Sequence, residues 1–369
     1  MKIKKTATIT FHKAINYGAV LQTYALQQSI LKLGVDNEVI DYSTKAIDDE
    51  YRLIKINSIK SFIKSCIIFP NFYYKKKNFK KFIDKYIHLT KYLTKSDLTK
   101  SDFSDKYDLF IVGSDQVWNY KLINNDATYL LDFVKYNEKK VSYAASFGID
   151  IIPNKLFSWY KNNLNSFNKI LLREKTGEKL LNDLLHKKAS IVLDPVFLLS
   201  QDSWNSILQK TKFDDMSNEY ILIYMSTPKI KKYAYDLSKK YNLKIFHITD
   251  FLLNQKIKIG NLEKELSPND FISAIKNAKF VVTSSFHGIV FSIIFNKIFF
   301  VDSMDKSKSL TSSRQKDILE LLEVGDRQIS VNKNDEDFIP IDWTLVNKKL
   351  SLERNKSLCE LKNLLRIEE

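Results

Sequence analysis

KFVVTSSFHGIVFSIIFNKIFF, residues 279–300, contains the pattern that decides the fold of this chain. Its β-branched and aromatic start, Phe280 to Val282, is typical of a buried strand. Hydroxyl side chains follow that can cap a helix, and the apolar run from His287 to Phe295 predicts this helix. A second apolar run over 298–301 predicts another strand. Strand, tight turn, buried helix and strand together form a βαβ unit of a parallel sheet.

The turn between the strand and the helix of this unit is the first candidate site. It lies at the carboxyl edge of the sheet, where α/β proteins bind ligands. The amides at Ser285–Ile289 are expected to point outward with a partial positive charge and to favour an anion. His287 is the best-placed ionisable side chain in this turn, and Gly288 follows it. A single histidine at a helix start can equally be a capping or packing residue, so spacing alone leaves both roles open.

Length and composition indicate a globular protein of two domains of ordinary size. The chain has 369 residues, which is long for one core, and 44% of them are apolar. Its apolar runs are too short to span a bilayer, and the N-terminal stretch lacks the apolar segment of a secretion signal. Cys66 and Cys359 are the only cysteines and lie far apart, which fits a reducing compartment. We therefore expect a cytoplasmic protein. Because neither cysteine and no histidine pair has metal-ligand spacing, we expect no metal site, and we expect no cofactor.

The formal charge of +15 raises the question of a polyanionic partner. One dense patch, YYKKKNFKKFIDK at 73–85, interleaves lysines with aromatic residues. Such a patch can stack nucleic acid bases, or it can lie on an anionic membrane. The alternative that we favour is an amphipathic helix with core aromatics and solvated lysines. Of the two binding hypotheses, peripheral membrane contact is preferred, because no nucleic-acid motif accompanies the patch.

Strand and helix patterns alternate along the chain and predict two doubly wound sheets. The first domain is predicted over 1–205, with a Lys- and Tyr-rich helical insertion at about 45–100. A polar stretch over 202–218 marks the junction, a second domain follows over 219–340, and 341–369 is a C-terminal helix. Two facing Rossmann-like domains are expected to leave a cleft between them, the usual place for a transferase with two substrates. The predicted strands outside the opening segment are 6–11, 38–42, 109–112, 140–145, 169–172, 190–193, 220–225 and 243–248, and the predicted helices are 18–33, 154–167, 176–185, 230–240, 269–277, 314–322 and 343–365.

Two further candidate sites follow predicted strands of the first domain. Asn16 and Tyr17 begin a Gly-containing turn after the first strand, and the amides of this turn can meet an anion. Asp115 follows the strand at 109–112, where a carboxylate can orient or deprotonate a substrate hydroxyl. A helix N-cap is an equally good interpretation of Asp115.

Three arginines are candidate anion ligands. Arg173 ends the strand at 169–172 and can hold a carboxylate bidentately, although an ion pair with Glu174 or another neighbour is the alternative. Arg314 and Arg327 flank a predicted helix of the second domain. The alternative interpretation is that both are solvated surface charges.

Several of these residues lie in blocks that together resemble the polysaccharide pyruvyl transferase family. The resemblance extends from Ile9 to Arg327 and leaves the insertion and the C-terminal helix without distinctive motifs. The blocks are NYGAVLQTYALQ (16–27), DLFIVGSDQVWN (108–119), SYAASFG (142–148), REKTGEKLL (173–181), LDPVFLL (193–199) and SPNDFISAIKNAKFVVTSSFHGIVFSIIF (267–295).

Membership in this family would imply a GT-B-like architecture of two Rossmann-like domains. It would also imply transfer of pyruvate from phosphoenolpyruvate onto a sugar, typically as a ketal that bridges two hydroxyls of a surface polysaccharide or its precursor. The expected partners are then phosphoenolpyruvate and a glycan or lipid-linked sugar.

The roles that the resemblance implies can be assigned residue by residue. His287 is the candidate general acid that protonates the methylene carbon, with contact to the phosphate as its second possibility. Arg173 is expected to hold the donor carboxylate or phosphate, and the amides from Ser285 to Gly288 to cradle the phosphate. Arg314 and Arg327 are weaker candidates for the donor phosphate. The candidate residues for binding the acceptor are Asp115, Asn16 and Tyr17. Asp115 is also a candidate catalytic residue.

One position departs from the family pattern. Some members have an arginine two residues before this histidine, where the present chain has Ser285. Another cation must then hold the phosphate, or the donor is a different molecule. A GT-B-type glycosyltransferase that uses a nucleotide-sugar is the alternative function, and a non-catalytic glycan- or membrane-binding module is the third.

Overall fold

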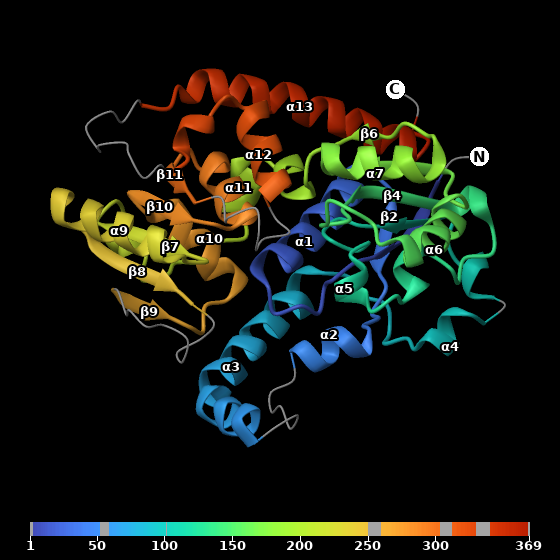
Figure 1. Cartoon of the computed structure of the whole chain (residues 1–369), viewed down its shortest axis with the longest axis horizontal. Coiled ribbons are helices and arrows are strands. Elements are labelled where there is room, and N and C mark those ends of the chain that lie inside the picture. The colour runs from blue at the N-terminus through green and yellow to red at the C-terminus, as the bar shows by residue number, and fades with distance from the viewer. Residues whose placement is uncertain are drawn as a thin grey trace. The chain divides into compact units, whose positions relative to one another are not determined.

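Two units of alternating strands and helices make up the chain (Figure 1). Its structure is a computed structural model that describes residues 3–51, 59–100, 102–249, 260–302, 312–329 and 340–367. The first unit comprises Met1–Tyr51, Ile83–Leu199 and Leu350–Glu369, and the second comprises Arg52–Phe82 and Ser200–Lys349.

The first unit is built on a six-stranded sheet in the order β2-β1-β3-β4-β5-β6, in which every pair is parallel. Because β1 lies between β2 and β3, the strand order reverses there, and the gap between β1 and β3 is the topological switch point. The strands are β1 (Lys5–Ile9), β2 (Asp36–Val39), β3 (Leu109–Val112), β4 (Lys140–Ala145), β5 (Lys169–Leu172) and β6 (Ser190–Ile191).

Helices cover both faces of this sheet, as the continuous apolar strands require. Leu109 and Ile111 of β3 share a core with α1 and with the end of α13, whereas Phe110 and Val112 face a core that contains α6 and α7. The helices of this unit are α1 (Tyr17–Lys32), α2 (Lys45–Glu50), α4 (Lys95–Leu98), α5 (Tyr120–Ile123), α6 (Asn154–Leu164) and α7 (Lys175–Leu185), and α13 (Trp343–Leu364) reaches it with its C-terminal part.

The predicted insertion is helical and contributes to both units. Its main element is α3 (Ile59–Tyr86), of which the part up to Phe82 belongs to the second unit. The favoured interpretation of the lysine-rich patch is right for Phe79 and Phe82, which are buried. It is wrong for Tyr73, which is exposed, and for Lys75, which is buried over the Phe79 ring. Residues 52–58 of the insertion and the side chain of Cys66 lie outside the described residues.

The second unit is built on a five-stranded parallel sheet in the order β11-β10-β7-β8-β9. The first strand of this unit, β7, lies between β8 and β10, so the switch point of this sheet is between β7 and β10. The strands are β7 (Tyr220–Tyr224), β8 (Lys244–Ile248), β9 (Asn261–Glu263), β10 (Phe280–Thr283) and β11 (Ile298–Val301).

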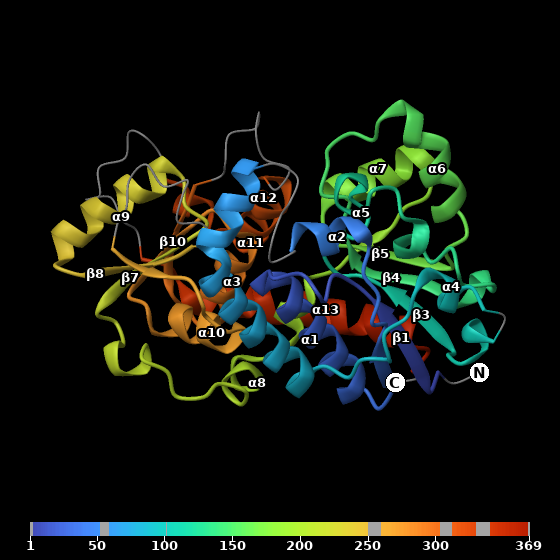
Figure 2. The ribbon, with the colours of Figure 1, turned by 90° about the horizontal axis from the view of Figure 1, so that it is seen from below.

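Helices lie on the two faces of the second sheet as well (Figure 2). Ile221 and Ile223 of β7 pack with α9, whereas Tyr224 contacts Phe271 of α10, and Phe271 contacts Phe291 of α11. The helices of this unit are α8 (Gln201–Asn205), α9 (Pro228–Tyr241), α10 (Pro268–Asn277), α11 (Phe286–Ile294) and α12 (Ser312–Leu321).

The predicted fold class, α/β with two Rossmann-like domains, is confirmed by these two parallel sheets. The start of α10 is also confirmed, because Ser267 and Asp270 form a reciprocal capping box with Pro268 at the first helical position. The three-residue strand β9 was not predicted, because its sequence Asn-Leu-Glu is too short and polar to give a strand pattern. The domain boundaries and the cleft between the domains stay predictions.

The βαβ unit of the opening segment forms β10, α11 and β11, and it contains a very close approach between turn and helix. The Ser285 Oγ atom caps α11 by accepting a hydrogen bond from the Gly288 amide at 3.3 Å. A Cβ atom on Gly288 would lie only 2.7 Å from Thr283 Oγ1. Thr283 cannot easily yield, because its hydroxyl donates to the Tyr224 carbonyl and accepts from the Ser285 amide. Glycine is therefore required here for steric reasons.

Replacing Gly288 with alanine is expected to destabilise the second unit by about 1–3 kcal/mol, as overpacking in a tight core does. Gly325→Ala is the matched control, because a Cβ atom there has no neighbour within 4 Å. Urea unfolding of both variants measures the difference. Equal stability of the two variants would contradict the steric explanation.

His247 is a titratable side chain buried in β8. Burial, and then the nearby charge of Lys231, lower the pKa of His247 from 6.5 to about 4. Between these two values the unfolded chain binds a proton that the folded chain does not. Stability that depends on neutral His247 is therefore present above about pH 6.5 and is lost as the pH falls toward 4.

In His247→Leu, the loss of stability between pH 7 and pH 4.5 is expected to be smaller than in the wild type, by up to about 3 kcal/mol. Urea unfolding at the two pH values gives this difference. The control is Phe246→Leu, which alters the adjacent side chain without removing a titratable group and should keep the wild-type pH dependence. An unchanged pH dependence in His247→Leu would refute the assignment.

Candidate functional site

The switch point of the second sheet brings the ends of β7 and β10 together. Thr283 at the end of β10 pairs with Tyr224 of β7. One residue further on, the Ser284 hydroxyl and amide both donate to the Met225 carbonyl, at 2.5 and 3.3 Å. The turn that carries Ser285, His287 and Gly288 is thus tied to the neighbouring strand end at the usual ligand position of such sheets.

His287 lies in the first turn of α11 at this switch point. Its residue is only 7% exposed, and its ring meets the Phe286 ring edge to face, with centroids 5.2 Å apart and an 84° angle between the planes. The imidazole is therefore held largely away from bulk solvent at the amino end of a helix. The role of His287 as an acid stays a prediction.

The helix α12 supplies two side chains to the same turn. Gln315 donates through Nε2 to the Ser284 carbonyl. The guanidinium carbon of Arg314 lies 5.8 Å from the centre of the Phe286 ring, and the residue is buried. Arg314 therefore lies beside the turn. The alternative interpretation, that Arg314 is a solvated surface charge, is wrong. Gln315 was not predicted, since an isolated glutamine in a helix carries no sequence signal.

Arg327 is also buried rather than solvated, and it pairs with the adjacent Asp326. The next residue, Gln328, forms a bridge with Val301 at the end of β11. Arg327 thus lies directly before the residue that bridges to the carboxyl end of β11. A donor contact for Arg327 stays a prediction.

In the first unit, Arg173 is the centre of a buried ionic cluster. Its guanidinium lies 2.9 Å from Asp194, 3.4 Å from Asp115 and 3.7 Å from Glu174, measured between nitrogen and oxygen. The Arg173 side chain is 2% exposed, and Asp115 is the most accessible of the three acids at 16%. Burial opposes the Arg173 charge, but the carboxylates of Asp115, Asp194 and Glu174 outweigh it and raise the pKa of Arg173.

Hydrogen bonds to the backbone and to side chains fix the acids of this cluster. Asp194 accepts from the Val196 amide at 3.0 Å, and Glu174 accepts from the Ser146 hydroxyl at 2.7 Å. The ion-pair alternative for Arg173 therefore describes its contacts in this structure, and its role toward a donor stays a prediction. Asp194 was not predicted as a partner, although an aspartate before Pro195 at a strand end was a usable sequence signal.

The predicted acceptor residues Asn16 and Tyr17 begin α1. Asn16 is exposed and caps the helix by accepting from the Ala19 amide at 3.2 Å, whereas Tyr17 is buried. Close by in sequence, His12 Nε2 lies 3.1 Å from Asp41; His12 follows β1 and Asp41 follows β2.

The structure thus forms two clusters from the predicted residues. Arg173 and Asp115 meet in the first unit. The turn with Ser285, His287 and Gly288 lies beside Arg314 in the second. His287 and Arg173 belong to different units, so a shared pocket for them stays a prediction.

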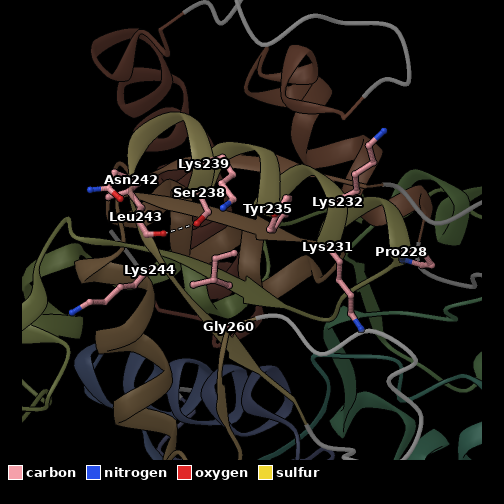
Figure 3. Close-up of a pocket in the computed structure, with 11 residues that line it drawn as sticks. Pro228, Lys231, Lys232, Tyr235, Ser238, Lys239, Asn242, Leu243, Lys244 and Gly260 are labelled. Carbon is pink, nitrogen blue, oxygen red and sulfur yellow. Dashed lines mark hydrogen bonds between the residues drawn. The ribbon is translucent and has the colours of Figure 1, made fainter.

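A hollow of about 710 Å³ lies along α9 in the second unit, and none of the predicted site residues lines it (Figure 3). It is rich in lysine, with Lys231, Lys232, Lys239 and Lys244 around it. The Ser238 hydroxyl beside it donates to the Leu243 carbonyl at 2.6 Å.

Within the described ranges, no three His, Cys, Asp or Glu side chains are grouped as metal ligands. Among the helices described, none is both long and apolar enough to cross a bilayer.

Replacing Arg173 with methionine is expected to cost about 3–5 kcal/mol of stability, because it leaves buried carboxylates without their counter-charge. Lys169→Met at the start of the same strand is the control. Lys169 pairs with Glu360 at 2.6 Å near the surface, where such a pair contributes about 0–1 kcal/mol. Urea unfolding distinguishes the two cases, and similar midpoints for both variants would show that the Arg173 cluster is not structural.

Comparison with solved structures supports the fold alone. A putative UDP-N-acetylglucosamine 2-epimerase from Listeria monocytogenes is 12% identical, with a TM-score of 0.52 over 100% of this chain and 98% of that one. The MnaA–UDP structure from S. aureus is 14% identical, with a TM-score of 0.50 over 99% and 98% of the two chains. No curated protein sequence matches the chain.

The sequence model of one family covers most of the chain, including the Arg173 cluster and the His287 turn. It is described as polysaccharide pyruvyl transferase and matches residues 16–301. The match contains the ends of β3, β5 and β10, where the candidate residues lie, and it bears out the resemblance of the sequence blocks. This chain therefore belongs to the polysaccharide pyruvyl transferase family.

Proposed function

We propose that the protein transfers pyruvate from phosphoenolpyruvate onto two hydroxyls of a sugar in a surface polysaccharide or its precursor. The observation that carries the proposal is the His287 turn. An ionisable ring, a helix start and a buried arginine, Arg314, lie together at the switch point of the second sheet. Family membership makes this a transferase and supports the choice of reaction.

The chemistry that we propose needs one acid and one anion site. Protonation of the methylene carbon of phosphoenolpyruvate makes an oxocarbenium-like centre, which a sugar hydroxyl attacks. Phosphate then leaves with cleavage of its carbon–oxygen bond, and a second hydroxyl closes the ketal. Of the two hydroxyl protons, one balances the proton added to the methylene carbon and the other leaves with phosphate. No cofactor beyond the co-substrate is needed.

Within this scheme we assign His287 as the acid, because it is a buried ionisable side chain in the first turn of α11. The Ser285 and Gly288 amides already donate to Thr283 Oγ1 and Ser285 Oγ, contrary to the expectation that they cradle the phosphate. The other amides of the first turn of α11 and the cation of Arg314 are suited to the donor phosphate. Arg314 would then replace the arginine that some members have at the position of Ser285. Arg327 is a weaker candidate for the same anion.

In the first unit we assign Asp115 to the acceptor, since it is the most accessible acid of its cluster. Arg173 is better suited to positioning Asp115 than to holding the donor, because three carboxylates already surround it. Asn16, exposed at the start of α1, is the other acceptor candidate.

His287→Ala is expected to lower phosphate release by about 10²- to 10⁴-fold, the usual contribution of a general acid. The assay incubates the purified full chain with phosphoenolpyruvate and candidate glycans, and detects phosphate together with the mass of a pyruvylated product. His88→Ala, which removes an exposed histidine, is the control and should keep wild-type activity. Unchanged turnover in His287→Ala would remove His287 from the mechanism.

Binding measurements separate this proposal from its alternative. Calorimetry should detect phosphoenolpyruvate at millimolar concentration, and Arg314→Gln should weaken that binding. A thermal shift with UDP but none with phosphoenolpyruvate would instead indicate a glycosyltransferase that uses a nucleotide-sugar.

For location we propose the cytoplasm, consistent with the two cysteines being far apart in sequence.

A further inference from the structure

The helix α3 presents three large aromatic side chains to solvent. Phe69, Tyr73 and Tyr74 are 36%, 44% and 51% exposed. Phe69 and Tyr73 stack with ring centroids 5.9 Å apart, and Tyr73 meets Tyr74 edge to face at 5.7 Å. The three rings therefore form one continuous exposed surface rather than scattered apolar side chains, and such patches mark interaction sites.

Exposed lysines continue this surface toward the C-terminal end of the helix. Residues three and four apart lie on one side of a helix. Continuing from Phe69 and Tyr73 in such steps reaches the exposed lysines, which therefore lie on the same side. Between residues 69 and 86, five lysines and a single acid are exposed, a net charge of +4 on this side. The aromatic–lysine face of α3 is Phe69, Tyr73, Tyr74, Lys76, Lys77, Lys80, Lys81 and Lys85, with Asp84 as its one acid.

The opposite side of α3 holds the helix to the protein. Lys75, Phe79 and Phe82 are buried there, with the spacing of one helix side. Asn78 adds a hydrogen bond from its Nδ2 to the Glu265 carbonyl at 2.7 Å. Because packing uses this side, the exposed aromatic rings are not needed for the core.

We infer that the aromatic–lysine face of α3 docks the protein peripherally on a bilayer that contains anionic lipids. Tyrosine has an apolar ring and a polar hydroxyl, and it is enriched at the headgroup level of membranes. Clustered lysines are attracted to the negative surface potential of such lipids. Rings and charges on one exposed side of a helix satisfy both requirements at once.

A single-stranded nucleic acid fits this face less well. Its binding sites combine a basic groove with aromatic rings on which bases stack. Here the rings of Phe69 and Tyr73 stack on each other, and they lie on the exposed side of a helix rather than in the lysine-lined hollow along α9.

Vesicle sedimentation of the full chain tests the inference. The chain should sediment with phosphatidylcholine vesicles that contain 30 mol% phosphatidylglycerol, in a salt-dependent manner, and not with phosphatidylcholine alone. The double variant Lys77→Glu/Lys81→Glu should lower the partition coefficient at least tenfold. Replacing the three aromatic residues with serine should lower it as well while leaving the salt dependence in place.

The matched control is Lys232→Glu/Lys239→Glu, which changes the same number of charges along the α9 hollow (Figure 3). It should keep wild-type sedimentation, and all variants should keep the wild-type circular dichroism and melting temperature. Equal losses from both lysine pairs would show that net charge alone drives binding and would overturn the inference. Absence of sedimentation would also overturn it, as would binding of a single-stranded oligonucleotide that depends on α3 while vesicle binding does not.

Discussion

Parallel pairing of every strand within each sheet is the constraint on which both candidate clusters depend. In a parallel sheet all strands end at the same edge, so residues that follow different strands come together there. Arg173 follows β5, Asp115 follows β3, and Asp194 lies just beyond β6, yet the three are in contact. The same rule brings the Ser284 turn after β10 against the end of β7.

The two clusters use the sheet edge in different ways. In the first unit a charged arginine is buried beside three acids, of which Glu174 and Asp194 accept further hydrogen bonds. Such a cluster contributes rigidity, because removal of Arg173 leaves the carboxylates as unpaired buried charges. In the second unit the turn consists of hydroxyls, a glycine and backbone groups, with His287 and Arg314 nearby. Fixed polar groups of this kind are suited to holding an anion without reorganisation.

The α3 helix shows how burial changes the meaning of a sequence pattern. Alternating lysine and aromatic residues predict a solvated amphipathic helix, and for Phe79 and Phe82 this is right. For Tyr73 and Lys75 the expectation is reversed, because the tyrosine is exposed and the lysine is buried. Periodicity gives the sides of a helix, but it does not say which side the rest of the protein covers.

The sequence by itself determined the alternation of strands and helices, the two sheets and the family blocks. These features depend on local periodicity, capping residues and glycine positions. The strands β3, β4, β5 and β11, for example, begin and end at the predicted residues. Only the tertiary structure decided which charges meet. Asp194 and Arg173 are 21 residues apart, and Gln315 is 31 residues from Ser284, so no local pattern links them. Contacts over such separations follow from strand order and from the packing of helices on the sheets, which a linear pattern does not contain.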